Sequence, residues 1–178
     1  FAGSRPNDTY VAASVIGRDP SPFLRYIIID KGSDDGLLRG MPVVTAQGLA
    51  GRVDAVIANA ARVQLINDPG SAVNVQLSAS RTEAILTGSL TGDVQLEMVP
   101  LDITLEPGEV VLTSALGGAY PSGILIGQVV SVRRLETDLF QTASVQPAVD
   151  FSSLRAVLVV TSFSPVNITP LLPAGTTP

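Results

Sequence analysis

Residues 40–45 read Gly-Met-Pro-Val-Val-Thr, and residues 51–56 read Gly-Arg-Val-Asp-Ala-Val. The same plan returns later, as Gly-Glu-Val-Val-Leu-Thr at 108–113 and Gly-Gln-Val-Val-Ser-Val at 127–132. Each copy has a turn glycine, a short β-branched strand, a glycine-rich connection and a second strand that begins at glycine. Two copies are too few for a solenoid, which needs about three stacked units. The pattern therefore predicts two related small β units, barrels or sandwiches, in one body.

Four glycines of this repeat are predicted to be structural. Gly40 and Gly108 precede the first strand of each copy, where the chain must turn. Gly51 and Gly127 open the second strand, where we expect the chain to bend or another backbone to approach closely. A side chain at Gly51 should therefore strain its barrel in the same way as a side chain at Gly127 strains the other.

The composition excludes several classes of function. A chain of 178 residues is long enough for one domain, or two small ones, with a real hydrophobic core. It contains no cysteine and no histidine, which removes disulfides, thiol catalysis, imidazole general bases and the commonest metal ligands. We therefore expect no enzyme activity and no cofactor.

The charges and the apolar runs argue against nucleic-acid binding and membrane spanning. The formal net charge is −5, and the basic residues are ten arginines and Lys31, of which only Arg133 and Arg134 are adjacent. This pattern lacks the basic stripe of a nucleic-acid binder. The longest apolar runs, such as 156–160, are far below the ~20 residues of a spanning helix. Residues 1–6 do not resemble a signal peptide, so we expect a fragment whose membrane anchor lies upstream.

Strands are predicted along nearly the whole chain, because short β-branched runs bounded by turn residues are typical of all-β barrels and sandwiches. Helical turns are expected only at 59–61 and 152–154. A hairpin is expected at 88–92 and a strong turn at 67–70. The twelve predicted strands are 10–16, 24–29, 42–45, 49–57, 62–66, 72–77, 84–87, 94–99, 110–113, 127–133, 142–145 and 156–161.

These strands divide the chain into four expected regions. Residues 1–9 form an N-terminal edge, residues 10–78 a first β-barrel and residues 79–164 a second, with strands that can be exchanged between the barrels. The tail, residues 165–178, has four prolines separated by small and polar residues and shows no apolar periodicity. We expect the tail to be extended or disordered.

Several motifs, taken in order, carry a resemblance to a known family. They are Gly32-Ser33-Asp34-Asp35-Gly36 leading to 40–44, then 48–53, Asn67-Asp68-Pro69, 113–123 and 147–151. Over about residues 15–160 the chain resembles the extracytoplasmic domain of the MreC family of bacterial rod shape-determining proteins. The cytoplasmic end, membrane helix and coiled coil of that family have no counterpart in these 178 residues.

The resemblance implies two six-stranded β-barrels, chymotrypsin-like in outline but without the catalytic site. It also implies a non-catalytic scaffold of the cell-wall elongation machinery, which maintains cell shape from the extracytoplasmic (periplasmic) face of the cytoplasmic membrane. The implied partners are a class B penicillin-binding protein, MreD and further copies of the chain, in a dimer or a filament. Two alternatives stay open. One is a periplasmic adaptor, because 106–112 resembles a segment of adaptor and lipoyl-like hairpins, and the other is a catalytically inactive protease-like domain.

Four residues are candidates for contact with a partner. Phe23, Arg25 and Tyr26 place two aromatic rings and an arginine beside a proline turn, which suits an interface hot spot and equally a core strand edge. Tyr120 lies within 117–123, where three glycines and a proline surround one tyrosine. It either contacts a partner or plugs the end of a barrel.

An acidic cluster, Asp30, Asp34 and Asp35, precedes Gly36. Oxygen ligands closed by a glycine suit calcium, but the spacing and the terminal glutamate of an EF-hand loop are missing. We therefore predict a solvated turn here and no metal.

Overall fold

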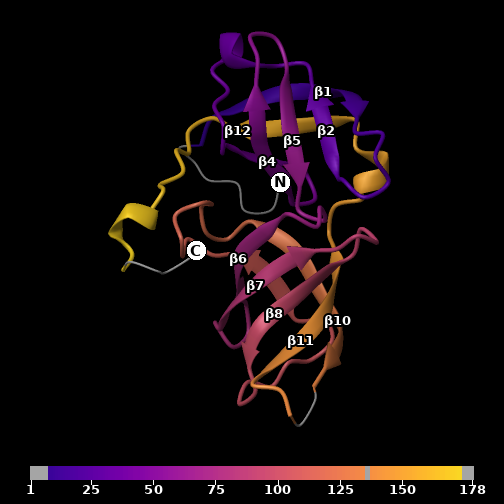
Figure 1. Ribbon diagram of the computed structural model, residues 1–178, viewed down its shortest axis with the longest axis vertical. Helices are drawn as coiled ribbons and strands as arrows, with labels where there is room; N and C mark the ends of the chain where they lie inside the picture. Colours follow the sequence, from indigo (N-terminus) through magenta and orange to yellow (C-terminus); the bar gives the residue numbers. More distant parts are fainter. Residues whose placement is uncertain (1–7, 135–136, 174–178) are drawn as a thin grey trace.

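The structure, a computed structural model, describes residues 8–134 and 137–173. Over these residues the protein is all-β, with two closed six-stranded antiparallel barrels stacked along the long axis of the molecule (Figure 1). All twelve predicted strands are present. They are β1 (Tyr10–Arg18), β2 (Tyr26–Ile29), β3 (Pro42–Val44), β4 (Leu49–Val56), β5 (Ala61–Leu65), β6 (Ala72–Leu77), β7 (Glu83–Gly88), β8 (Val94–Pro100), β9 (Val110–Thr113), β10 (Leu125–Arg133), β11 (Phe140–Pro147) and β12 (Ala156–Val160).

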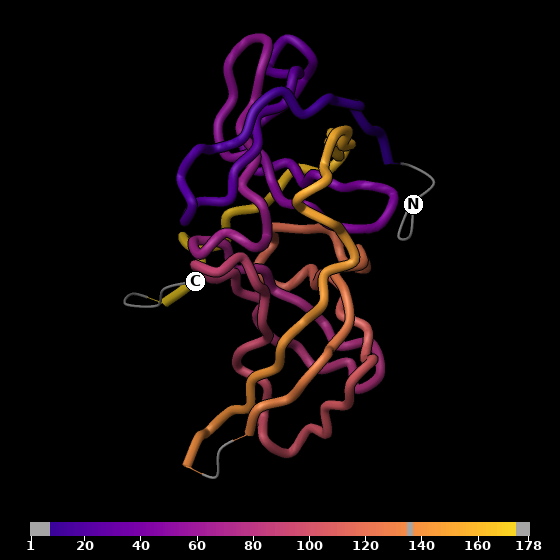
Figure 2. The backbone as a smooth tube through the Cα atoms, turned by 90° about the vertical axis from the view of Figure 1, so that its right-hand side faces the viewer, coloured from indigo at the N-terminus to yellow at the C-terminus, as the bar shows by residue number. Residues whose placement is uncertain are grey.

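The strand order shows which strands build each barrel. The first barrel closes in the order β1-β12-β3-β4-β5-β2 and the second in the order β10-β11-β8-β7-β6-β9. The predicted boundary at residue 78 is therefore wrong, because β6 belongs to the second barrel. β12, predicted within the second region, returns to pair with β1 and β3 of the first. Figure 2 shows this return after β11, in the orange part of the trace.

The turn glycines of the repeat occupy matching positions in the two barrels. Gly40 and Gly108 both have a positive φ, 93° and 94°, a backbone conformation that glycine adopts without a Cβ penalty. The Gly40 amide donates to the Val53 carbonyl oxygen at 2.7 Å, and the Gly108 amide donates to the Val129 carbonyl oxygen at the same distance. The predicted turns therefore use the same hydrogen bond in both copies.

The strand glycines also match. Gly51 in β4 pairs with Leu65, and Gly127 in β10 pairs with Pro147. A Cβ on Gly51 would lie 2.8 Å from the Gln64 carbonyl carbon, and a Cβ on Gly127 would lie 2.9 Å from the Gln146 carbonyl carbon. Both approaches are far inside van der Waals contact, so the neighbouring backbone occupies the space of a side chain at both sites.

The hydrophobic core has two clusters that meet where the barrels join. The cluster inside the first barrel contains fully buried side chains such as Ile27, Ile29 and Val63. The cluster inside the second barrel also includes buried residues from the end of the first: Val44, Leu49, Ile66 and Val160. Apolar packing is therefore continuous across the junction, which supports one fixed arrangement of the barrels.

Backbone contacts reinforce the junction between the barrels. Between β1 and β12 the chain passes from the first barrel to the second after β5 and returns between β11 and β12. A Cβ on Gly48, in the β3–β4 turn, would lie 3.2 Å from the Leu125 carbonyl carbon of the second barrel. A Cβ on Gly88 would lie 2.5 Å from the Asn67 carbonyl carbon. Glycine at these two positions therefore permits the barrels to pack backbone against backbone.

Short 3₁₀ helices complete the described chain: η1 (Ser33–Asp35), η2 (Phe151–Ser153) and η3 (Thr169–Leu171). The predicted turn at 152–154 corresponds to η2, whereas residues 59–61 form no helical turn and lead directly into β5. The tail was expected to be extended or disordered. Disorder is wrong for residues 165–173, which include η3 and a hydrogen bond to the second barrel, and residues 165–168 form no helix or strand. Residues 1–7 and 174–178 of the expected edge and tail lie outside the described residues.

Candidate functional site

The loop between β1 and β2 presents two apolar side chains at the junction of the barrels. Pro20 and Pro22 cannot donate a backbone hydrogen bond, so side chains hold the loop instead. The Ser21 amide donates to Asp19 Oδ1 at 2.8 Å, and the Phe23 amide donates to Ser21 Oγ at 3.2 Å. Phe23 is 57% exposed and the next residue, Leu24, is 44% exposed. The loop therefore presents an aromatic and an aliphatic side chain on an ordered backbone.

Arg25 has a different role from its neighbours, because it packs between the barrels. Its guanidinium lies against Gly92 of the β7–β8 hairpin, where an added Cβ would be 3.0 Å from Arg25 Cζ. Its Nε is buried and has no hydrogen-bond partner among the described residues. A small cavity of about 250 Å³ lies beside it, lined also by Leu24 and Asn67. Arg25 therefore packs mainly between the two barrels, and less of its side chain faces solvent.

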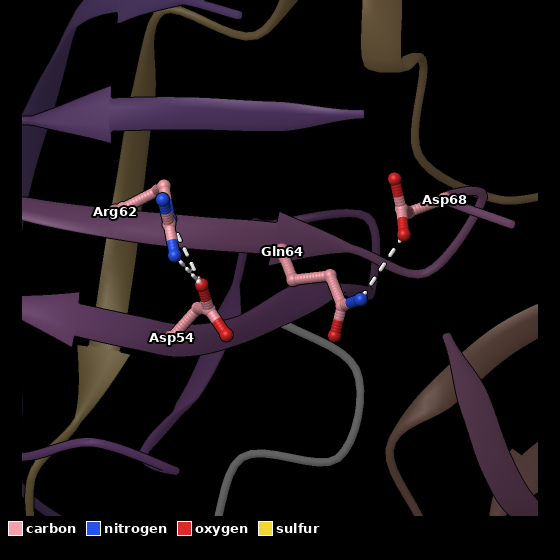
Figure 3. Close-up of polar contacts among 4 residues, drawn as sticks. All are labelled: Asp54, Arg62, Gln64 and Asp68. Carbon is pink, nitrogen blue, oxygen red and sulfur yellow. Dashed lines mark hydrogen bonds and ion pairs between the residues drawn. The ribbon is translucent and has the colours of Figure 1, made fainter. Parts of the chain in front are cut away.

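Asp68 is the polar centre of the junction and is 1% exposed. Its Oδ1 accepts the Arg25 amide at 2.8 Å, and its Oδ2 accepts the Gly70 amide at 2.8 Å. Gln64 Nε2 also donates to Oδ2, at 3.1 Å (Figure 3). The Asp68 carboxylate is thus hydrogen-bonded to β5, to the β1–β2 loop and to the segment that connects the two barrels after β5. The sequence predicted only a turn at this position.

Tyr26 and Arg62 lie side by side on neighbouring strands of the first barrel. The Arg62 guanidinium carbon is 5.0 Å from the centroid of the Tyr26 ring, within the range of a cation–π contact. Arg62 also forms an ion pair with Asp54 of β4 (Figure 3). Burial raises the pKa of Tyr26, the carboxylates of Asp68 and Asp54 raise it further, and the Arg62 charge opposes them. Tyr26 therefore stays protonated at neutral pH, with the Arg62 guanidinium over its ring.

We call Phe23, Leu24, Tyr26 and Arg62 the junction surface. It combines exposed apolar side chains with a stacked arginine, a composition enriched in protein interfaces. Of the predicted partner contacts, Phe23 and Tyr26 belong to it, whereas Arg25 is mostly engaged between the barrels. Leu24 lies within the stretch 23–26 that the sequence singled out, but it was not itself one of the four candidate contacts.

The prediction that Tyr120 contacts a partner is wrong for this structure. Its side chain is 4% exposed and belongs to the core cluster of the second barrel. Burial raises its pKa to about 12, and the nearby Arg52 charge offsets only part of that rise. Tyr120 therefore fills the barrel end, which was the other interpretation of this residue.

The acidic residues near Gly36 are used to hold the local backbone. Asp35 Oδ2 accepts the Gly32 amide at 3.1 Å, and Asp30 Oδ1 accepts the Ser14 amide at 2.8 Å. Within residues 8–134 and 137–173 no group of three or more Asp or Glu side chains is placed to bind a metal ion. In the same part of the chain no helix has the length and apolar character needed to cross a membrane.

Comparison with known proteins gives a consistent result. A family model described as Rod shape-determining protein MreC, barrel core, matches residues 15–161. Cell shape-determining protein MreC of Listeria monocytogenes is 36% identical over 153 residues, which cover 83% of this chain and 52% of that protein. The Escherichia coli protein of the same name is 30% identical over 95% of this chain and 46% of its own length. The crystal structure of MreC from Pseudomonas aeruginosa has a TM-score of 0.81 at 32% identity, over 86% of this chain and 99% of that one.

Two stacked, closed, six-stranded antiparallel β-barrels define the class of this protein as an all-β, two-barrel domain. The family model matches most of the sequence and identifies the family: the chain belongs to the MreC family of bacterial cell shape-determining proteins. It spans about half the length of the curated relatives that it matches. The family resemblance is thereby confirmed, and it displaces the adaptor and inactive-protease alternatives.

Proposed function

We propose that this domain is a periplasmic, non-catalytic scaffold of cell-wall elongation that binds a class B penicillin-binding protein through the junction surface. Membership of the MreC family supports the role in cell shape. A solved complex between Penicillin-Binding Protein (PBP2) and MreC from Helicobacter pylori contains a chain of the same fold, with a TM-score of 0.70 over 87% of this chain. That complex supports the class of partner, and the location of the surface comes from the residues of this chain.

The observation that carries the proposal is the exposed pair Phe23 and Leu24 on a loop whose backbone is already fixed. Binding through an ordered loop avoids much of the entropy cost of ordering a flexible one. The neighbouring Tyr26 and Arg62 are held by their cation–π contact, and Arg62 is held further by Asp54. An apolar centre with a pre-positioned arginine at its side is the arrangement expected of an interface hot spot.

The experiment is retention of the penicillin-binding protein from solubilised membranes on the immobilised domain, followed by titration of the purified pair. Phe23→Ser and Leu24→Ser should each weaken binding by about 30-fold, which corresponds to roughly 2 kcal/mol for a hot-spot residue. Leu139→Ser is the control, because Leu139 is 83% exposed and precedes β11 at the far end of the second barrel. Equal binding by all three variants and the unaltered domain would reject the junction surface.

The proposal includes weak self-association, in a dimer or a filament, and MreD as a further partner suggested by the family. Closed barrels leave no free sheet edge, so copies of the chain must meet through side-chain surfaces. A similar fold, with a TM-score of 0.73, occurs in the major periplasmic domain from the cell shape-determining filament MreC. Sedimentation over a wide concentration range tests this part, and a constant monomer would remove it.

A further inference from the structure

The segment that follows β12, yellow in Figure 1, leaves the first barrel and runs beside the junction of the two barrels. We call residues 162–173 the strap. Pro165 packs against the Gly40 turn of the first barrel, with its Cγ 3.0 Å from where a Cβ on Gly40 would lie. The Val166 amide donates to the Gly118 carbonyl oxygen of the second barrel at 2.9 Å. The strap therefore contacts both barrels within two consecutive residues.

The strap lies against both barrels in a groove that it fills only in part, because a cavity of about 450 Å³ remains between strap residues 165–169 and the barrel walls. Residues of both barrels line it: Arg39, Gly40, Arg52, Val53, Asp54, Gly117 and Ala119. The Val166 carbonyl oxygen lies 2.7 Å from the position that a Cβ on Gly118 would take. Glycine at 118, with a φ of 78°, thus gives the extended strap its close approach to the wall.

The walls of the groove are held by contacts that do not involve the strap. The Ser114 amide donates to the Asn74 carbonyl oxygen at 2.9 Å, and Asn74 Nδ2 donates to the Leu116 carbonyl oxygen at 3.0 Å. The opposite wall is fixed by the hydrogen bond from the Gly40 amide to Val53. The groove is therefore preformed, and binding costs only the conformational entropy that the occupant itself loses.

The charges of the groove do not match the strap. Arg39 and Arg52 line the groove, and neither forms an ion pair within the described part of the chain. Asp54, the one carboxylate in the lining, is already paired with Arg62. The strap contains no charged residue. The strap packs a partly buried Phe163 against the core of the second barrel and makes one backbone hydrogen bond to the groove wall, but it offers no charged side chain to the exposed guanidinium groups of Arg39 and Arg52.

We propose that the groove is a binding site for an extended, proline-containing protein segment that carries a carboxylate, and that the strap is its intramolecular occupant. A carboxylate beside the proline gains charge-assisted hydrogen bonds from Arg39 and Arg52 that the strap cannot offer. The strap holds its place through high effective concentration, since it is joined directly to β12. Beyond the partly buried Phe163, the strap leaves two large apolar side chains mostly exposed, 60% for Val166 and 85% for Leu171, so a better-matched segment displaces it from residue 165 onward.

The experiment measures binding of two fluorescent peptides to the full chain. One peptide has the sequence of residues 162–173, and the other has Asp at the position of Asn167, which lines the groove. Val166→Pro removes the amide that bonds Gly118, while Val166→Ala keeps it and serves as the matched control. We expect the acidic peptide to bind Val166→Pro about fivefold more tightly than Val166→Ala. It should also bind about fivefold more tightly than the neutral peptide, an advantage lost in an Arg39→Gln, Arg52→Gln variant.

A second pair of variants tests the location of the site. Gly118→Val places a side chain where the Val166 carbonyl oxygen now lies, and it should abolish binding of both peptides. Gly123→Val imposes the same backbone strain, at a φ of 88°, in a place with no atom within 4 Å, and it should bind as the unaltered chain does. Equal affinity of Val166→Pro and Val166→Ala, or equal affinity of the two peptides, would overturn the proposal.

Discussion

Alanine at Gly51 or at Gly127 should destabilise the protein by the same mechanism in each barrel. The new Cβ would overlap the carbonyl oxygen of Gln64 or Gln146 and lie 3.0 Å from the following Cα, of Leu65 or Pro147. Non-bonded carbon atoms prefer separations of about 3.5–4.0 Å, so the paired strands must move apart by roughly 0.5–1 Å. The ladder hydrogen bonds beside the glycine then lengthen.

The expected cost follows from those hydrogen bonds. Each buried backbone hydrogen bond contributes about 1 kcal/mol, and a buried group left without a partner costs about 1–3 kcal/mol. Weakening one or two of them should lower the free energy of unfolding by about 2–4 kcal/mol in each variant. For a chain of this length that corresponds to a fall in Tm of about 4–16 °C. Urea denaturation and thermal melting followed by circular dichroism measure both quantities.

Gly17→Ala is the matched control, because Gly17 is also in a barrel strand and, like Gly51 and Gly127, has no positive φ. A Cβ there would lie 3.5 Å from Ile28, an ordinary contact. This variant should change stability by less than about 0.5 kcal/mol, the range of a substitution without a steric cause. If Gly51→Ala and Gly127→Ala were as mild as Gly17→Ala, the equivalence of the two copies would be a coincidence of sequence.

Two further predictions concern buried polar groups. Asp68→Ala should lower the free energy of unfolding, measured by urea denaturation, by about 2–4 kcal/mol, because the Arg25 and Gly70 amides and Gln64 Nε2 lose their acceptor. Asp93→Ala, at an exposed hairpin, is the control, and similar stabilities of the two variants would contradict the role of Asp68. Burial raises the pKa of Tyr120 to about 12, above the ordinary value of 10.0, so the stability it contributes is complete below pH 10 and falls as the pH rises from 10 to about 12. Ultraviolet titration should show this tyrosine ionising last, and Tyr120→Phe should remove that step and reduce the alkaline loss of stability.

The strands were predictable because their causes are local. β6 alternates as Val73, Asn74, Val75, Gln76 and Leu77, and the structure buries its three apolar positions while the polar positions are less buried. A hairpin was expected at 88–92, and β7 and β8 pair across it, with a φ of 83° at Gly92. Alternation, β-branching and turn residues act within a few residues of one another, so they can be recognised in one sequence.

The partners of the strands were not predictable, because pairing is non-local. Nothing in residues 156–160 distinguishes a partner in β3 from one in β11, and β12 pairs with β1 across nearly the whole chain. Asp68 shows the same limit, since Asn-Asp-Pro-Gly indicates an exposed turn and becomes buried only when two barrels close over it. Tyr120 was a surface candidate for the same reason: glycine-rich flanks indicate a loop but not the direction of the ring.

The difference between the two copies explains where the strap's groove comes from. In the first copy the Thr45 amide donates to the Gly48 carbonyl oxygen at 2.8 Å, and a tight turn joins β3 to β4. In the second copy the Thr113 amide makes the equivalent bond, also at 2.8 Å, but to Ile124, so the connection is a longer loop. The added residues bury Tyr120 and place Gly118 against the strap. The repeated hydrogen bonds thus preserve the barrel, while the longer connection between them supplies the Gly118 wall of the proposed groove, as loops on a fixed scaffold commonly carry the variable surfaces of a fold.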